Sequence, residues 1–278
     1  GWRPTHVGVS GGRHDLSGAG GRPVSLLLRA GPIEAVLFDY GLTLVHFERP
    51  VEAVEAAQVA IAARIEAAGH RRPDVAVLRE AVHDRVEAEV GAHEASGALE
   101  EVDVAALQQR AFADIGLDLD AGLREQCSVL VQEAWWHGVR PYPDALPTLR
   151  VLRESSLRIG ICSNAAYHSA SVHGQLAHVG FAALLDAAVF SGEVGWRKPS
   201  PRLFEAALSA LGTSAAGTVF VGDRVREDIR GAADAGMRTV LIVRDGAGAQ
   251  EEAAENAPDA IITSLSELPA LLLDESQL

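Results

Sequence analysis

The sequence predicts an α/β fold, a doubly wound parallel sheet with an inserted α-helical domain, and three observations carry this prediction. A short apolar run of strand type stands at residues 35–38 and ends at Asp39. A stretch of helical composition follows, from residue 51 to residue 137. From Pro141 onward, short apolar runs alternate with helical segments, a pattern typical of parallel strands joined by right-handed crossovers.

The amino-acid composition bounds the class of the protein and its partners. The 278 residues are 48% hydrophobic, and 24 Lys and Arg against 38 Asp and Glu give a formal net charge of −14. This charge disfavours non-specific binding to nucleic acid and to anionic membrane surfaces, so we expect neither as a partner. No uninterrupted apolar run reaches the roughly 18 residues of a membrane span. The composition leaves the oligomeric state open.

The two cysteines, Cys127 and Cys162, lie far apart and fit neither a metal-binding spacing nor a disulfide framework. We expect both to be buried thiols. Because the N-terminal region also has no basic-then-apolar signal pattern, we expect a cytoplasmic location.

The chain begins with a glycine-rich stretch at residues 1–22, which has no period of two or 3.6, so we expect a disordered leader there. The α/β core is predicted to comprise residues 23–45 and 141–278. Its first apolar run, residues 35–38, suits a buried parallel strand. Asp39 then lies at the carboxyl end of a strand, where ligands bind in open α/β sheets.

Residues 46–140 are predicted to form the helical domain. Apolar residues recur there at helical spacing, for example Val54, Ala57 and Ile61, so each helix has one face to bury. Charged side chains in this region, His83 and Arg140 among them, are expected to be solvated. Four helices are predicted, at residues 51–68, 74–95, 101–114 and 120–137.

The remaining chain is predicted to alternate between helices and strands. The predicted helices span residues 143–154, 165–179, 200–211, 226–235 and 265–273. The predicted strands span residues 157–162, 186–190, 218–222, 238–243 and 259–262.

Polar residues follow four of the predicted strands. They are Asp39 and Thr43, Ser163 and Asn164, Lys198, and Asp223 with Asp228. Because the carboxyl ends of parallel strands meet at one edge of a sheet, we expect these side chains to converge. Carboxylates, hydroxyls and a lysine together suit a phosphate group and a divalent cation.

Four motifs resemble those of the haloacid dehalogenase superfamily. They are FDYGLTLV at residues 38–45, ICSN at 161–164, WRKPSPRLF at 196–204 and VGDRVREDIRGAADAGM at 221–237. A lone GD or SN is common, but all four in order, each after a predicted strand, make the resemblance specific. It covers residues 33–273 and implies a Rossmannoid core with a helical cap of the C1 type at residues 46–140.

The resemblance also implies an activity, because most members of the superfamily are phosphatases. Asp39 would attack phosphorus, and water would hydrolyse the resulting aspartyl-phosphate. The implied substrate is a small-molecule phosphate ester, and the implied cofactor is Mg²⁺. The implied metal-binding groups are the carboxylates of Asp39 and Asp223, the backbone carbonyl of Gly41, and Asp228. The residues implied to hold the phosphate are Thr43, Ser163, Asn164 and Lys198.

Gly41 departs from the pattern of the superfamily. In its typical phosphatases, the residue two positions after the nucleophile is a second aspartate, which acts as general acid and base. Losing such a group usually costs about 10²–10⁴-fold in rate. Slow turnover, a good leaving group or a substitute acid such as His46 therefore stay open.

Two other functions also stay open. The 2-haloacid dehalogenases of the superfamily lack the second aspartate and need no metal, but they generally do not keep the Gly-Asp pattern seen here at Gly222-Asp223. Clustered carboxylates repel one another unless they are paired or metal-bound, so Asp223 and Asp228 favour the phosphatase. A non-catalytic binding module is the third possibility, motivated by Gly41 alone.

Each motif residue also has a structural alternative. Asp39 could be a turn residue that bonds its own backbone. Ser163 and Asn164 could cap the following helix, and Asp228 could pair with a neighbouring arginine at the surface. Lys198 could be a surface charge.

Overall fold

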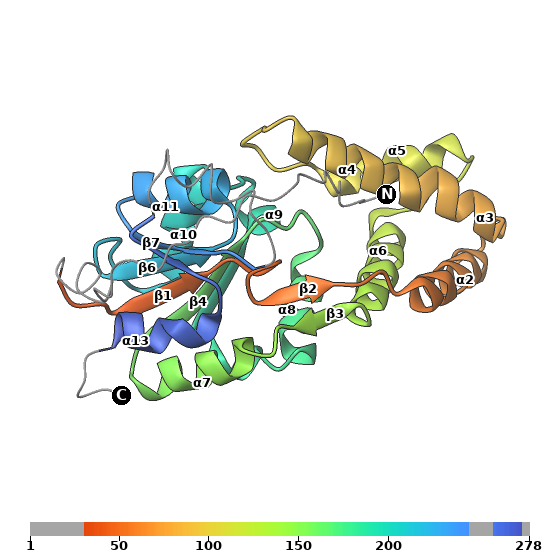
Figure 1. The fold of residues 1–278 in the computed structure, drawn as a ribbon. Helices are drawn as coiled ribbons and strands as arrows, with labels where there is room; N and C mark the ends of the chain where they lie inside the picture. The colour runs from red at the N-terminus through yellow and green to blue at the C-terminus, as the bar shows by residue number, and fades with distance from the viewer. Residues whose placement is uncertain (1–30, 245–257, 274–278) are drawn as a thin grey trace, which may run out of the picture.

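The computed structural model describes residues 31–244 and 258–273, so the expected leader at residues 1–22 lies outside the described part. Its main sheet has six strands, in the order β5-β4-β1-β6-β7-β8 (Figure 1). All neighbouring strands run parallel, which confirms the predicted doubly wound sheet. The strands are β1 (Ala35–Phe38), β4 (Arg158–Ser163), β5 (Ala187–Phe190), β6 (Thr218–Gly222), β7 (Arg238–Ile242) and β8 (Ala260–Ile262).

Strand β1 occupies the middle of the sheet, and all its residues are fully buried. Its last residue, Phe38, pairs with Ile161 of β4 on one side and with Val221 of β6 on the other. The backbone N–H of Asp39 continues this ladder and donates to the carbonyl of Val221 at 2.9 Å. Asp39 is therefore fixed between the ends of two neighbouring strands.

Helices cover both faces of the sheet, because successive residues of a strand point to opposite sides. Val36 and Phe38 pack with helices α7 (Ala145–Glu154), α8 (Ser169–His178) and α13 (Leu268–Leu272). Ala35 and Leu37 pack on the other face with α10 (Pro201–Leu211) and α11 (Gly231–Asp234). The shorter elements are η2 (Ala182–Leu184), α9 (Ser191–Val194), η3 (Val225–Arg230) and η4 (Leu265–Glu267).

The helical region lies beside the sheet in Figure 1 and has its own apolar core, with Ile61, Leu78 and Phe112 among its members. Three helices begin at aspartates, Asp74, Asp103 and Asp120, whose side chains accept hydrogen bonds from backbone N–H groups of the first turn. The elements are α2 (Val51–Ala67), α3 (Val75–Leu78), α4 (Arg85–Ala95), α5 (Val104–Asp114) and α6 (Ala121–Trp136).

The predicted helix at residues 74–95 is not uniform, because a π-helical segment, η1 (Arg79–Asp84), joins α3 to α4. The expectation that His83 is solvated is wrong: this residue of η1 is 8% exposed. It is buried because the π-helical segment is packed against the core of the helical region. Arg140, in contrast, is exposed, as expected.

A short antiparallel ribbon that the sequence does not predict connects the helical region to the sheet. Strand β2 (Val45–Phe47) pairs with β3 (Val139–Pro141), so the chain leaves and re-enters the sheet region side by side (Figure 1). Gly138 is required beside it, since a Cβ there would lie 1.8 Å from the carbonyl oxygen of Glu48. Within the described ranges, no helix has the length and apolarity needed to cross a membrane.

Candidate active site

Four buried side chains meet where β1, β4 and β6 end. The Oδ1 atom of Asp39 accepts hydrogen bonds from Ser163 Oγ at 2.8 Å and from Lys198 Nζ at 2.6 Å. Lys198 Nζ also donates to Asp228 Oδ1 at 2.6 Å. The exposed fractions of the Asp39, Lys198 and Asp228 side chains are 10%, 2% and 1%, so this charged cluster is almost fully enclosed.

Asn164 holds the backbone of Lys198. Its Oδ1 accepts from the N–H of Lys198 at 2.8 Å, and its Nδ2 donates to the carbonyl of the same residue at 3.4 Å. Both polar atoms of the amide are thereby engaged. These contacts give Asn164 a positioning role, and its contact with a phosphate stays a prediction.

The charges of the cluster depend on one another. Burial alone would lower the pKa of Lys198, but the carboxylates of Asp228 and Asp39 raise it above its ordinary value, so the lysine stays cationic. Burial raises the pKa of Asp228, and the neighbouring lysine only partly offsets this. Burial, followed by the charges of Asp39 and Asp228, raises the pKa of Asp223 to about 7. Three carboxyl groups, those of Asp39, Asp223 and Asp228, therefore surround one ammonium group, that of Lys198.

The side chain of Asp228 can reach the cluster only because the last residue of β6, Gly222, has no side chain. A Cβ at Gly222 would lie 2.4 Å from Asp228 Cγ, a distance that no packing tolerates. The second oxygen of Asp228 accepts from the N–H of Arg224 at 2.9 Å. The surface pairing considered as an alternative for Asp228 is therefore wrong, since the side chain points into the cluster.

Asp39, Asp223 and Asp228 together offer a set of oxygen atoms for a cation. One oxygen of each lies within 4.8 Å of the others. Carboxylate oxygens are the donors that hard divalent cations prefer. The cluster could therefore hold such a cation, which would also relieve the repulsion that raises the pKa of Asp223.

The turn after Asp39 brings Thr43 to the same place. Thr43 is fully buried, and its Oγ1 donates to Asp223 Oδ1 at 3.5 Å, the long end of a hydrogen bond. At Gly41, a Cβ would lie 3.0 Å from Cε2 of Phe47. The aromatic ring thus borders the space that a longer side chain would occupy at this position.

His46, considered as a substitute acid, lies elsewhere. Its ring packs against Tyr142, with 5.2 Å between the ring centroids, and its Nε2 is 3.8 Å from Glu48 Oε1. Within residues 31–244 and 258–273, no hydrogen bond or ion pair joins it to the Asp39 cluster. Its role in proton transfer is therefore unsupported.

Arg197, one residue before Lys198, makes contacts that sequence analysis missed. Its guanidinium binds both oxygens of Glu101, at 2.8 and 3.0 Å, and Glu94 at 2.9 Å. Its N–H donates to the carbonyl of Leu99, and the N–H of Glu101 donates to the carbonyl of Gly195. These bonds attach the α4–α5 connection to the segment that carries the lysine. No motif marks Glu101, so only the fold reveals the pair.

Comparison with known proteins gives one family. The family model described as haloacid dehalogenase-like hydrolase matches residues 33–236. Among curated proteins, a glyceraldehyde 3-phosphate phosphatase of Methanopyrus kandleri is 35% identical over 130 residues, which cover 47% of this chain and 55% of that protein. The chain thus spans little more than half the length of this relative.

Solved structures match over more of the chain. A HAD phosphatase from Thermococcus onnurineus has a TM-score of 0.57 at 24% identity, over 86% of this chain and 98% of that one. A 2-haloacid dehalogenase from Pseudomonas syringae pv. Tomato DC3000 has a TM-score of 0.58 at 25% identity, with the same coverage. Because both kinds of hydrolase match equally well, the site must distinguish between the two activities.

Proposed function

Because the chain belongs to the haloacid dehalogenase-like hydrolase family, we propose that it hydrolyses the phosphate ester of a small metabolite. The observation that carries this proposal is the enclosure of Lys198 by Asp39 and Asp228, with Asp223 within reach of both carboxylates. A dehalogenase that attacks carbon would have no use for so many carboxylates. A phosphatase would use them to hold a divalent cation beside a phosphate.

Asp39 is the proposed nucleophile. Two hydrogen bonds fix its Oδ1, and its Oδ2 has no partner among the described residues, so this oxygen is available to attack phosphorus. A bond from Asp39 to phosphorus forms as the bond to the ester oxygen breaks, and that oxygen takes a proton from water. A water molecule then attacks phosphorus, which releases phosphate and restores the carboxylate.

Ser163, Lys198 and Thr43 are the proposed donors to the phosphoryl oxygens. The lysine stays protonated because neighbouring carboxylates raise its pKa, so it can offset the negative charge of the phosphate. Ser163 is 5% exposed and Thr43 is fully buried, which limits competition from water.

We also propose Mg²⁺ as the cation. The groups that would hold it are Asp39, Asp223 and the backbone carbonyl of Gly41, with Asp228 as a ligand or a supporting partner. When bound, the ion would neutralise negative charge that develops on the phosphoryl oxygens.

Residues 46–140 are proposed to act as a cap over the core formed by residues 23–45 and 141–278. The β2–β3 ribbon and the Arg197–Glu101 pair support this division, because they are among the contacts that opening of a lid would bend or break. Closing would exclude water from the site.

A cytoplasmic location is proposed as well, since Cys127 and Cys162 are both free and buried.

Hydrolysis of a generic phosphate ester tests the proposed reaction. The purified chain should release phosphate from p-nitrophenyl phosphate with Mg²⁺, and Asp39→Asn should lower kcat by about 10⁴-fold or more because the nucleophile is lost. Asp234→Asn, at an exposed carboxylate of α11, is the matched control and should keep full activity.

The same assay separates the alternatives. Halide release from 2-chloropropionate, undiminished by a chelator, would identify a dehalogenase, the function that Gly41 favours. Binding of Mg²⁺ and of a phosphoryl analogue without turnover of any phosphate ester would identify a binding module.

A further inference from the structure

Glu101 is a buried carboxylate of the helical region that no sequence motif marks. It lies in the connection between α4 and α5, residues 96–103, and its side chain is 3% exposed. Both of its oxygens accept hydrogen bonds from the guanidinium of Arg197, and Oε2 also accepts from the hydroxyl of Ser191. The N–H of Val102 donates to Oε1 at 2.9 Å. A single side chain of the helical region thus binds two residues of the core.

Arg197 connects Glu101 to Lys198, the next residue in the chain. The N–H of Arg197 donates to the carbonyl of Leu99 at 2.8 Å. The N–H of Glu101 donates to the carbonyl of Gly195 at 3.0 Å, and an antiparallel bridge joins the residues between these two bonds. The segment that ends at Lys198 is therefore held in one register against the helical region.

Ser191 connects Glu101 to the loop that follows Ser163. Its Oγ accepts from the N–H of Ala165 at 2.7 Å, while its hydroxyl donates to Glu101. Ser191 is fully buried, and the N–H of the next residue, Gly192, donates to the carbonyl of Ala165 at 2.9 Å. A Cβ at Gly192 would lie 2.9 Å from this oxygen, so the two segments are in close contact. Because Ala165 is only two residues from Ser163, these bonds restrain the position of the serine.

The two connections lead to the same atom of the carboxylate cluster. Oδ1 of Asp39 accepts from both Ser163 Oγ and Lys198 Nζ, so the two donors must be placed correctly relative to each other. Asn164 joins their segments inside the site, since its side chain bonds the backbone of Lys198. Glu101 joins the same two segments a second time, from the helical region.

The ion pair of Arg197 and Glu101 restrains direction as well as distance. The two side chains are 6% and 3% exposed, so both charges have lost most of their hydration. Apolar residues could hold two regions together equally well, because desolvation offsets much of the attraction in a buried ion pair. A guanidinium that binds both oxygens of a carboxylate also fixes the orientation of the pair. The geometry of the contact therefore supports a role in alignment.

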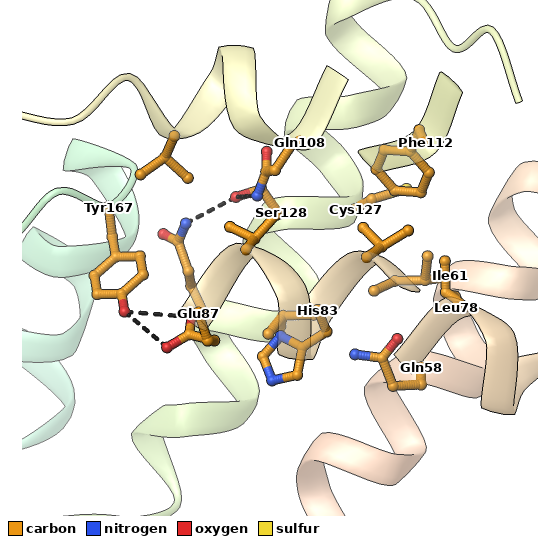
Figure 2. Close-up of a pocket in the computed structure, with 15 residues that line it drawn as sticks. Gln58, Ile61, Leu78, His83, Glu87, Gln108, Phe112, Cys127, Ser128 and Tyr167 are labelled. Atoms are coloured by element: carbon orange, nitrogen blue, oxygen red, sulfur yellow. Dashed lines mark hydrogen bonds between the residues drawn. The ribbon is translucent and has the colours of Figure 1, made fainter. Parts of the chain in front are cut away.

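Another contact between the Ser163 loop and the helical region offers a comparison. The hydroxyl of Tyr167 donates to the carboxylate of Glu87, whose two oxygens lie 3.3 and 3.2 Å away (Figure 2). Within the described ranges, no hydrogen bond joins either of these side chains to the segment of Lys198. Tyr167 thus attaches the loop to α4 without aligning it with the lysine.

We propose that Glu101 is a positioning residue of the active site. It aligns Ser163 with Lys198, the two donors that share Oδ1 of Asp39. The alignment is complete only when the α4–α5 connection is docked against the core, so a residue of the helical region assists the reaction without touching the substrate. This inference rests on the proposed phosphatase function.

Two substitutions interrupt the connection at different points. Glu101→Gln keeps the shape and removes the charge, whereas Ser191→Ala removes the hydroxyl and leaves the ion pair in place. In each variant, KM for p-nitrophenyl phosphate with Mg²⁺ should rise by about 10-fold and kcat should fall by less, because the phosphate donors lose their alignment while the nucleophile is kept. If Glu101→Gln does not fold, Ser191→Ala decides the outcome.

Glu100→Gln and Tyr167→Phe are the matched controls. Glu100 is the neighbouring, exposed carboxylate, so its substitution makes the same change of charge in the same connection. Tyr167→Phe removes a hydrogen bond between the helical region and the Ser163 loop that does not reach Lys198. Both controls should keep KM within about 2-fold of the parent chain. A rise in either control as large as that in Glu101→Gln would contradict the assignment.

Hydrogen exchange tests the alignment without turnover. The informative backbone N–H lies on the far side of Glu101 from each substitution: that of Lys198 in Ser191→Ala, and that of Ala165 in Glu101→Gln. Each should exchange at least about 10-fold faster than in the parent chain, because its segment opens more often. Exchange in β1 should not change, since a general loss of stability would speed it as well.

The two measurements together separate this inference from the proposed reaction. If the parent chain does not hydrolyse p-nitrophenyl phosphate but exchange becomes faster as expected, the phosphatase fails and the alignment by Glu101 stands. If the parent chain hydrolyses the ester and neither KM nor exchange changes in the two variants, the alignment fails alone. Faster exchange with an unchanged KM would make Glu101 a purely structural contact and would also overturn the proposal.

Discussion

The absence of a side chain at Gly41 is the feature on which the rate of the proposed reaction depends. His46 does not replace it as a proton donor, since its ring packs against Tyr142. The ring of Phe47 borders the vacant space, but it is 42% exposed and can turn toward solvent. The backbone at Gly41 is not in the left-handed region, so a larger residue is tolerated there.

Gly41→Asp should therefore restore a general acid. For an alkyl phosphate, whose leaving oxygen needs a proton, kcat should rise by about 10²-fold. For p-nitrophenyl phosphate, whose leaving group departs without protonation, it should change little. Steady-state kinetics with both substrates measure the difference.

Gly41→Asn is the matched control, because it has the same shape but no proton to donate at neutral pH. It should give no gain with either substrate. Equal gains for the aspartate and asparagine variants would mean that packing against Phe47, and not proton transfer, limits turnover.

At the scale of the elements, the strands could be predicted to within a residue. Short apolar runs bounded by glycine or charge, such as residues 218–222, leave little freedom in where a buried strand begins and ends. The helices of residues 74–95 and 120–137 were predictable at their starts because Asp74 and Asp120 cap them.

The missed elements are those too short to show a period. Strands β2 and β3 have three residues each, and α9 has four. The contacts of Arg197 with Glu101 and of Tyr167 with Glu87 were also unpredictable, because each joins segments at least 80 residues apart with no motif on the acidic side. The convergence of Asp39, Ser163 and Lys198, in contrast, follows from parallel strands alone.

The Arg197–Glu101 pair stabilises the contact between the helical region and the segment that carries Lys198. The side chains are only 6% and 3% exposed, so Arg197→Met should leave a buried carboxylate without its partner and destabilise the fold by about 3–5 kcal/mol. It should also raise KM for a phosphate ester more than it lowers kcat, because the helical region loses its attachment beside Lys198. Urea unfolding and steady-state kinetics measure the two effects.

A double-mutant cycle provides the control. Adding Glu101→Leu to Arg197→Met removes the buried carboxylate that the single substitution leaves without a partner. The double variant should therefore be more stable than Arg197→Met alone. Simple additivity of the two single substitutions would contradict the pairing.

At the scale of the whole molecule, Asp144 joins parts of the chain that are distant in sequence. It accepts hydrogen bonds from Arg244, from Ser264 Oγ and from the N–H of Leu265. Burial alone would raise the pKa of Asp144, but these hydrogen bonds hold it below its ordinary value. Arg244 also donates to the carbonyl of Thr43 at 2.9 Å, so this contact supports the turn that carries the proposed site.

The depressed pKa of Asp144 predicts a stability that depends on pH. A group whose pKa is lower in the folded state stabilises the fold above its unfolded pKa of about 3.9 and loses that effect as pH falls through the folded pKa. Asp144→Asn should therefore lower the free energy of unfolding by about 1.5–3 kcal/mol at pH 7 and by less near pH 3. Urea unfolding of both chains at the two pH values measures the difference. The same loss at both would contradict the assignment.

The parallel arrangement around β1 has a consequence for the order of folding. Asp39 meets Ser163 and Lys198 across 124 and 159 residues of chain, so the site requires the closure of long loops. The helices of residues 51–136 pack with one another, the first helix, α2, against the last, α6, so they close shorter loops than the site does. On a nascent chain the helical region can fold early, whereas the nucleophile gains its partners only after most of the protein has been synthesised. The proposed active site thus forms late, when the last strands of the sheet are in place.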